Sequence, residues 1–437
     1  MSLWVGLRAQ LDREFGNATA NMLRGAGSFL VVHVASLGIA YLVNAYIARR
    51  IGASGYGEFV YGVAWKNVLL VPALFGLSVG AIRFGATYTG KQEWGLLRGF
   101  LAWSERLVLV AGLLAAALFA GVVWLLQERI SETLFEVLVI TACALPLHAV
   151  MVLDSAQLRG FGRLLSSQVP QALVYPLIQF ALVFSFGVTL AWQAAAADVI
   201  AIAVVCCVVA YVASRATPAA ARSAEKAYDR RVWIATLAPL MWIDLVNAVM
   251  DRTDILMLGA LVGTHEAGVY AVASRVATTI TFGLVAGNAW AAPQFAEHFS
   301  RGETAELQRL VRSVARLILL FSVPAVAGIL LLGPFLLGIF GPEFREGFTV
   351  LIILAAGHLI SAAMGPVAYL TTMTGGQRDA AVILSASALI GVVANLLLIP
   401  RFGAIGAACS ALLMRLLWNV AMAIRLRQRT GLRTFAL

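Results

Sequence analysis

The stretches RRIGASGYGEF, residues 49–59, and ALVGTHEAGVY, residues 260–270, decide how this chain is built. An offset of 211 positions aligns Gly52 with Gly263, Gly57 with Gly268 and Phe59 with Tyr270. Further along, at an offset of about 215, LRGFGR (158–163) faces MTGGQR (373–378). A chain with 39 glycines would produce one or two such matches by coincidence, but not a series in two registers. The pattern therefore predicts two copies of one structural unit.

The composition around these stretches is that of a membrane protein. Of the 437 residues, 61% are hydrophobic and 12% are charged, whereas a soluble domain has about 25% charged residues. Twelve apolar runs reach the roughly 20 residues that a helix needs to cross a bilayer. Six spans per copy place both copies in the membrane in the same direction. We therefore expect an all-α polytopic membrane protein with twelve transmembrane helices, in two six-helix lobes related by a parallel internal repeat around a central cavity.

The distribution of basic residues predicts the orientation. Of the 32 Lys and Arg residues, 23 fall in segments that are inside if the N-terminus is inside, and five fall in outer loops. Both termini are therefore expected in the cytoplasm, and this asymmetry explains the net charge of +10 without nucleic acid. The expected parts are an amphipathic interfacial segment (1–24), an N-lobe (25–214), a cytoplasmic linker (215–231), a C-lobe (232–425) and a cytoplasmic tail (426–437).

Charged residues within the seventh apolar run are the first candidates for function. In NAVMDRTDILML (247–258), Asp251, Arg252 and Asp254 interrupt a sequence that is otherwise apolar. At 100° per residue, Asp244, Asn247, Asp251 and Asp254 share one stripe, and Arg252 lies at its edge. The matching segment of the first copy, AYLV (40–43), has no charge. The charges are thus not required by the fold, although a structural ion pair with one surplus carboxylate is the alternative.

Two further runs carry polar stripes. His33 and Asn44 lie on one face of the first run, at positions that correspond to the acidic stripe. The fifth run carries Gln168, Gln171, Tyr175 and Gln179 at helical spacing, interrupted by two prolines, which membrane helices tolerate beside water or polar partners. These residues are expected either to line an aqueous cavity or to bind polar groups on a neighbouring helix.

Lys66 and Arg275 lie about 12 Å from the outer edge of their runs, at 1.5 Å per residue. A charge at the bilayer centre costs at least ~2.5 kcal/mol, and such residues usually pair, face the bundle interior or mark a pathway. We therefore expect both residues in the central cavity. Arg83, at the inner end of its run, is better explained by a side chain that extends to the interface.

Motifs for enzymatic chemistry are absent. The chain has no GxxxxGK[ST], HExxH or GxSxG motif, and no extramembrane loop long enough for the sugar-nucleotide site of a glycosyltransferase. The four cysteines fall within predicted spans without metal-binding spacing. We expect a transporter without cofactor or metal. Its energy would come from an ion gradient, the membrane potential or the substrate gradient, and Asp244, Asp251 or Asp254 would carry H+ or Na+ if an ion gradient is used.

The two copies around YIARRIGASGYGEFVYG (46–62), GLSVGAIRFGA (76–86) and DRTDILMLGALVGTHEAGVYAVASR (251–275) resemble the MOP exporter superfamily (multidrug, oligosaccharidyl-lipid, polysaccharide). The most similar branch is that of the Wzx-type oligosaccharide flippases and polysaccharide biosynthesis membrane proteins. The resemblance extends over essentially the whole chain through glycine and aromatic patterns. It implies a bacterial inner-membrane flippase that moves a glycan on a polyprenyl pyrophosphate from the inner to the outer leaflet by alternating access.

The resemblance also assigns roles. Lys66, Arg252 and Arg275 would attract the pyrophosphate, and Asn44, Asn247, His33, Gln171, Tyr175 and Gln179 would contact the sugar. Expected partners are membrane lipid, a polysaccharide polymerase and chain-length machinery. The lipid II flippase branch carries several arginines on its first helix, and their absence from that helix here argues against lipid II as the substrate. A cation-coupled multidrug or metabolite exporter is the alternative, because that branch uses membrane carboxylates.

Overall fold

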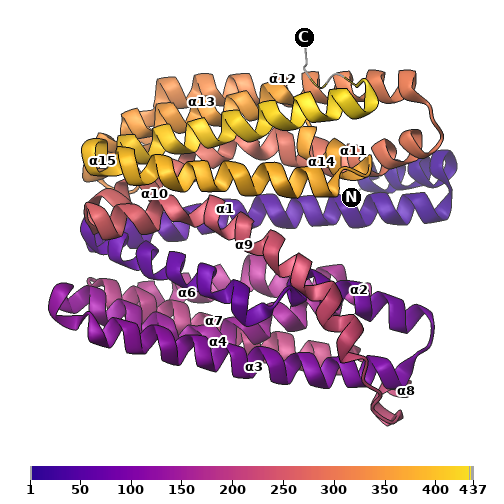
Figure 1. Ribbon diagram of the computed structural model, residues 1–437, viewed down its shortest axis with the longest axis horizontal. Helices are drawn as coiled ribbons and strands as arrows, with labels where there is room; N and C mark the ends of the chain where they lie inside the picture. The colour runs from indigo at the N-terminus through magenta and orange to yellow at the C-terminus, as the bar shows by residue number, and fades with distance from the viewer. Residues whose placement is uncertain (1, 433, 435–437) are drawn as a thin grey trace.

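The computed structural model describes residues 2–432 and 434, with side chains described except at residues 2–31, 33, 34, 286, 289 and 290. Within these ranges every regular element is a helix (Figure 1). The α-helices are α1 (Ser2–Leu74), α2 (Leu77–Gly90), α3 (Trp94–Leu125), α4 (Glu132–Gly160), α5 (Leu164–Val169), α6 (Tyr175–Ser185), α7 (Ala191–Ala216), α8 (Ala219–Ser223), α9 (Arg230–Leu261), α10 (Thr264–Thr278), α11 (Phe282–Ser300), α12 (Thr304–Gly338), α13 (Phe348–Met364), α14 (Val367–Met373) and α15 (Gln377–Thr430). The short elements are the 3-10 turns η1 (Gln127–Arg129), η3 (Thr279–Thr281) and η4 (Pro342–Gly347) and the π-helical turn η2 (Pro170–Val174).

The long helices α1 and α15 each fold back on themselves at a glycine. Gly52 and Gly403 have φ angles of 72° and 56°, which glycine adopts without steric cost. The Tyr56 hydroxyl donates a 3.0 Å hydrogen bond to Asn44, twelve residues earlier, whereas a straight helix would separate them by about 18 Å. These two glycines therefore act as tight turns between antiparallel segments.

Nine helices are long and apolar enough to cross a bilayer within the described ranges, and ten if α1 from Ala35 and α2, bent by 41°, count as one more span. The chain is thus a multi-pass, all-helical membrane protein. The number of twelve spans and the internal repeat stay predictions. The N-terminal segment 1–24 is helical from Ser2, but its side chains, and those of Arg433 and residues 435–437 in the tail, lie outside the description.

The helices form two bundles, and α9 runs obliquely between them (Figure 1). One bundle contains α2, α3, α4 and α7, and the other contains α11 to α15. Around the turn at Gly52, the two bundles share one hydrophobic cluster, to which Ile47, Val272 and Ala407 all belong. At the opposite end each bundle has clusters of its own. The bundles are therefore joined by apolar packing at one end and separately packed at the other.

Helix α9 belongs to both bundles. Its first half packs on the N-lobe, where Trp233 and Leu237 join a buried cluster with Leu77 and Phe100. The Trp233 indole donates a 2.8 Å hydrogen bond to the Tyr88 hydroxyl. Its second half contributes Ile255 and Leu258 to the shared cluster. The boundary expected at residue 232 therefore divides the sequence between the two lobes, but α9, which follows it, packs against both bundles.

The bundles touch through a pair of glycines. A Cβ atom on Gly57 would lie 1.7 Å from the Thr264 carbonyl oxygen, and one on Gly268 would lie 2.3 Å from the Ala53 carbonyl oxygen. The contact is reciprocal, because the offset of 211 relates both Gly57 to Gly268 and Ala53 to Thr264. Such close approach of two backbones is the usual role of glycine between membrane helices.

At the same end of the molecule, two glutamate side chains accept hydrogen bonds from the backbone of the glycine turns. Glu343 accepts a 2.8 Å hydrogen bond from the Ala53 amide, just after the turn at Gly52. Glu266 accepts a 2.9 Å bond from the Ala404 amide, just after the turn at Gly403. Both turns are therefore held by a side chain from an adjacent element.

Candidate substrate and cation sites

The N-lobe contains a buried carboxylate that the sequence analysis did not single out. Asp198 of α7 forms an ion pair with Lys66 of α1, accepts a hydrogen bond from the Tyr175 hydroxyl of α6, and lies 3.5 Å from the Gln179 amide nitrogen. Lys66 and Asp198 are each 3% exposed. Burial of one charge would cost several kcal/mol, and the opposite charge with further hydrogen bonds offsets that cost.

This arrangement changes the expected role of Lys66. We expected it to face the cavity as a free cation, but it lies inside the N-lobe with its charge neutralised by Asp198. The signal for the pair was present in the sequence, since Asp198 is the sole charge in the apolar run from Ala191 to Val212. The sequence does not show that α1 and α7 pack so that Lys66 and Asp198 lie next to each other.

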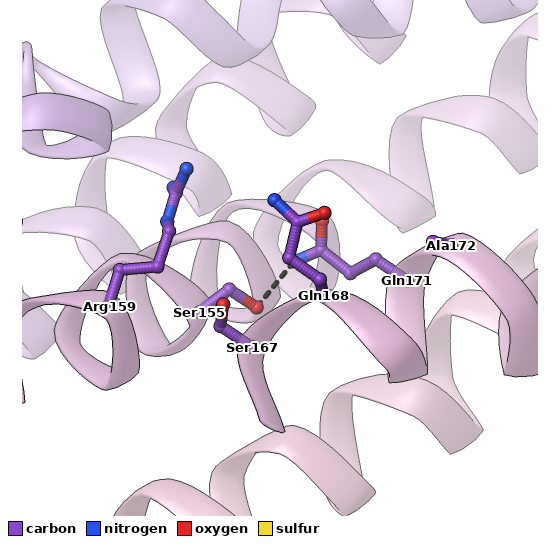
Figure 2. Close-up of a pocket in the computed structure, with 6 residues that line it drawn as sticks. All are labelled: Ser155, Arg159, Ser167, Gln168, Gln171 and Ala172. Atoms are coloured by element: carbon purple, nitrogen blue, oxygen red, sulfur yellow. Dashed lines mark hydrogen bonds between the residues drawn. The ribbon is translucent and has the colours of Figure 1, made fainter. Parts of the chain in front are cut away.

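The polar stripe of the fifth span also binds its neighbours. The Gln171 amide donates to the Ser155 hydroxyl, and Tyr175 and Gln179 contact Asp198. Of the two interpretations left open by the sequence, polar packing within the lobe describes these three residues. The fourth, Gln168, lines a small cavity beside Arg159 instead (Figure 2).

The C-lobe holds a second buried carboxylate, in the stripe that the sequence predicted. Asp254 of α9 is 9% exposed and accepts hydrogen bonds from the Tyr270 hydroxyl at 2.5 Å and from the Asn395 amide at 2.7 Å. Arg415 acts on this carboxylate electrostatically, but no cation lies within ion-pair distance of it among the described side chains. Asp254 is therefore held by neutral donors.

The other residues of the α9 stripe are more accessible. Asn247 and Asp251 are exposed, whereas Asp244 is half-buried and accepts a 2.5 Å hydrogen bond from the Ser78 hydroxyl of α2. Arg252 is half-buried, and the charges of Asp251 and Arg275 both act on it. The alternative of a structural ion pair at Arg252 does not involve Asp254, because Asp254 bonds to Tyr270 and Asn395 instead.

Arg275 of α10 lies where the two bundles meet. Its guanidinium is next to the Tyr56 hydroxyl, and its charge also acts on Tyr41 and Tyr175. Tyr56 in turn donates to Asn44, whose amide donates to the Ala40 carbonyl at 2.7 Å. The structure thus brings together Asn44, Arg252 and Arg275, which we call, with Tyr56 and Asp251, the interlobe site. His33 lies in α1, but its side chain is outside the described part of the structure.

The interlobe site combines two guanidinium groups with an exposed carboxylate. No carboxylate lies within ion-pair distance of Arg275 among the described residues, so its charge is available to an anion. Guanidinium groups bind phosphate oxygens through two parallel hydrogen bonds. Chemically, the interlobe site can bind a phosphate group, and the Asp254 cluster can exchange a small cation.

Comparison with known proteins identifies the family and the fold. Residues 22–299 match the family described as "Polysaccharide biosynthesis protein". The chain is 24% identical over 422 residues to the probable low-salt glycan biosynthesis flippase Agl15 of Haloferax volcanii, covering 90% of this chain and 81% of that protein.

Two solved structures share the fold. One is the inward-facing conformation of a multidrug resistance MATE family transporter of the MOP superfamily, with a TM-score of 0.71, 12% identity, and coverage of 92% of this chain and 98% of that one. The other is the lipid II flippase MurJ in an inward closed conformation, with a TM-score of 0.68, 9% identity, and coverage of 91% and 87%.

These findings define first a class and then a family. The chain is a polytopic membrane protein with the fold of the MATE transporter and of the lipid II flippase MurJ. It belongs to the polysaccharide biosynthesis protein family.

Proposed function

We propose that the protein is a flippase that moves glycans linked to polyprenyl pyrophosphate from the inner to the outer leaflet of the cytoplasmic membrane. The observation that carries this proposal is the position of Arg275, a cation without an ion-pair partner among the described residues, at the junction of the two bundles. A pyrophosphate needs such a cation in a membrane environment. Family membership and the similarity to a glycan biosynthesis flippase point to the same substrate class.

The proposed cycle uses the two ends of the molecule. With the N-terminus in the cytoplasm, the Gly57–Gly268 contact lies at the outer surface, so the two bundles are closed there. The head group enters from the inner leaflet, where the bundles pack separately, and binds Arg275 and Arg252. Asp254 exchanges H+ or Na+ as the bundles rock, because its neutral hydrogen-bond donors leave the carboxylate charge for a cation.

Reconstituted vesicles test this proposal. Arg275→Ala and Asp251→Asn should each lower the rate of lipid-linked glycan flipping, because one removes a phosphate contact and the other alters the charge beside Arg252. The measurement is the fraction of glycan that becomes accessible to an external enzyme over time. If both variants flipped the glycan at the rate of the unmodified protein, the interlobe site would not be the substrate site.

A cation-coupled exporter of drugs or metabolites is the second candidate. The exposed carboxylate of Asp251 favours it, because a cationic drug would bind there rather than at Arg275. The same vesicles distinguish the two: an exporter would move a cationic dye in response to an ion gradient and leave the lipid-linked glycan in place. For the flippase, a polysaccharide polymerase and chain-length machinery are the proposed partners.

A further inference from the structure

A small cavity lies in the N-lobe (Figure 2). It has a volume of about 240 Å³ and lies between α4 and the segment α5–η2. Its lining consists of Ser155, Arg159, Ser167, Gln168, Gln171 and Ala172. We call it the Arg159 pocket. A space of this size accommodates a phosphate or pyrophosphate group.

The groups around the pocket leave a surplus of donors. Gln171 and Ser155 are bonded to each other, and the Ser167 hydroxyl donates a 2.7 Å bond to the Leu164 carbonyl. Arg159 and Gln168 extend toward the same side of the two helices in Figure 2. These two side chains therefore remain to contact a ligand.

Arg159 has no anion beside it. Its Nε atom is buried without a hydrogen-bond partner, and no carboxylate is within ion-pair distance among the described side chains. A buried donor on a charged group that lacks a partner costs free energy, so such an atom requires an explanation. A basic residue that only extends to water would keep its guanidinium hydrated, as the exposed Arg163 does four positions later.

The position of the pocket suggests the source of the anion. Arg159 lies in the last turn of α4, which ends at Gly160, and Leu164 begins α5, so the pocket lies near the connection between the fourth and fifth spans. The predicted orientation places this connection in the cytoplasm. Phosphate groups of inner-leaflet lipids lie at that depth.

We propose that the Arg159 pocket is a loading site, which binds the phosphate group of the polyprenyl pyrophosphate carrier before it reaches Arg275. This inference rests on the proposed flippase function and adds a second phosphate site to it. Arg159 supplies the positive charge and Gln168 a neutral donor. The pocket is then the place where the carrier is selected from among the lipids of the inner leaflet.

Binding of undecaprenyl pyrophosphate without glycan, to the full chain in phosphatidylcholine nanodiscs, tests the proposal. All comparisons are made in an Arg252→Ala/Arg275→Ala background, so that neither guanidinium group of the interlobe site contributes. We expect this background to retain binding, Arg159→Ala to weaken it by about tenfold or more, and Arg163→Ala, the matched control, to leave it unchanged. Gln168→Leu keeps the charge and should weaken binding by a few-fold. The Gln168→Leu protein should have the same thermal stability as the background protein, which shows that its weaker binding does not come from unfolding.

Three outcomes would overturn the loading site. Arg159→Ala and Gln168→Leu could both bind the carrier as the background does, or the background could lose all binding while the unmodified protein retains it. Phosphatidylglycerol at the same molar concentration could displace the carrier, in which case the pocket binds bulk lipid phosphate. Failure of the flippase function looks different, because the unmodified protein would then neither bind nor flip the carrier lipid.

Discussion

Asp198 in the N-lobe and Asp254 in the C-lobe are both buried carboxylates, and each is bound by a tyrosine and near an amide side chain. They differ in their third partner. Asp198 forms an ion pair with Lys66, whereas Asp254 has no cation within ion-pair distance among the described residues. The charges of Lys66 and Asp198 cancel, so the N-lobe cluster has no net charge. The Asp254 cluster has a net negative charge unless the carboxylate binds a cation or a proton. This difference is why we propose Asp254, and not Asp198, as the carboxylate that exchanges an ion.

The same two lobes are matched where they touch. Gly57 faces the backbone of α10 and Gly268 faces the backbone of α1, in a reciprocal contact. The lobes therefore share the geometry of this glycine contact and differ in the chemistry of their buried clusters. Changes to the clusters should have unequal effects in the two lobes, and changes to the glycines should have similar effects.

The largest expected effect is that of Lys66→Met. It leaves Asp198 buried without its cation, and we expect the free energy of unfolding to fall by about 3–5 kcal/mol, measured by denaturation in detergent micelles. The double variant Lys66→Met/Asp198→Asn, which is neutral, should recover most of the loss. A stable Lys66→Met protein without transport would instead place Lys66 in contact with substrate.

The glycine contact should be next in size. Gly57→Ala and Gly268→Ala each force a Cβ atom into a carbonyl oxygen of the other lobe, at a cost of about 1–3 kcal/mol to the closed end of the molecule, which the proposed cycle places outside. Both variants should raise the rate at which an impermeant maleimide labels a cysteine placed at the buried Ala53, about 5- to 150-fold. The matched control is Gly38→Ala, since a Cβ there meets nothing within 4 Å. Unchanged labelling in both variants would mean that this contact does not close the outer end.

Asp254→Asn should leave the protein folded and slow its transport. The amide cannot exchange a cation, so the flipping rate should fall by about tenfold or more and lose its dependence on the H+ or Na+ gradient. Asp198→Asn is the comparison in the other lobe, and it should lower stability because Lys66 becomes unpaired. An Asp254→Asn protein with normal gradient dependence would contradict the proposed exchange site.

The smallest effects should come from the two tyrosines. Tyr270→Phe and Tyr175→Phe each remove one hydrogen bond to a carboxylate that keeps its other donors, worth about 1.5 kcal/mol, the lower end for a charged acceptor. Tyr270→Phe should change the cation concentration that gives half-maximal transport by a few-fold. Tyr175→Phe should lower stability by a similar free energy without that change, because Lys66 still neutralises Asp198. A shift of cation dependence by Tyr175→Phe would show that both lobes exchange ions.

Much of the fold and part of the candidate site could be predicted from the sequence. Apolar runs indicated a helical membrane protein, since a helix is one of the few structures that satisfies its backbone in lipid. Asp254 and Arg275 were predicted as candidates because a charged side chain within a bilayer costs free energy and therefore needs a partner or a function. Asp198 and the Arg159 pocket were not predicted, because each is defined by a neighbouring helix distant in the sequence.

Composition and periodicity thus determined that this chain spans a membrane and which faces of its helices are polar. Separately, its glycine and aromatic patterns resemble those of the MOP superfamily. The free-energy cost of placing a polar or charged residue in lipid depends mainly on that residue, so it can be predicted from the sequence. Only the tertiary structure decided that Lys66 is neutralised by Asp198, that Asp254 is left without an ion pair among the described residues, and that α9 belongs to both bundles. Those properties depend on distances between helices, and a charge acquires its role from the partner that packing places beside it.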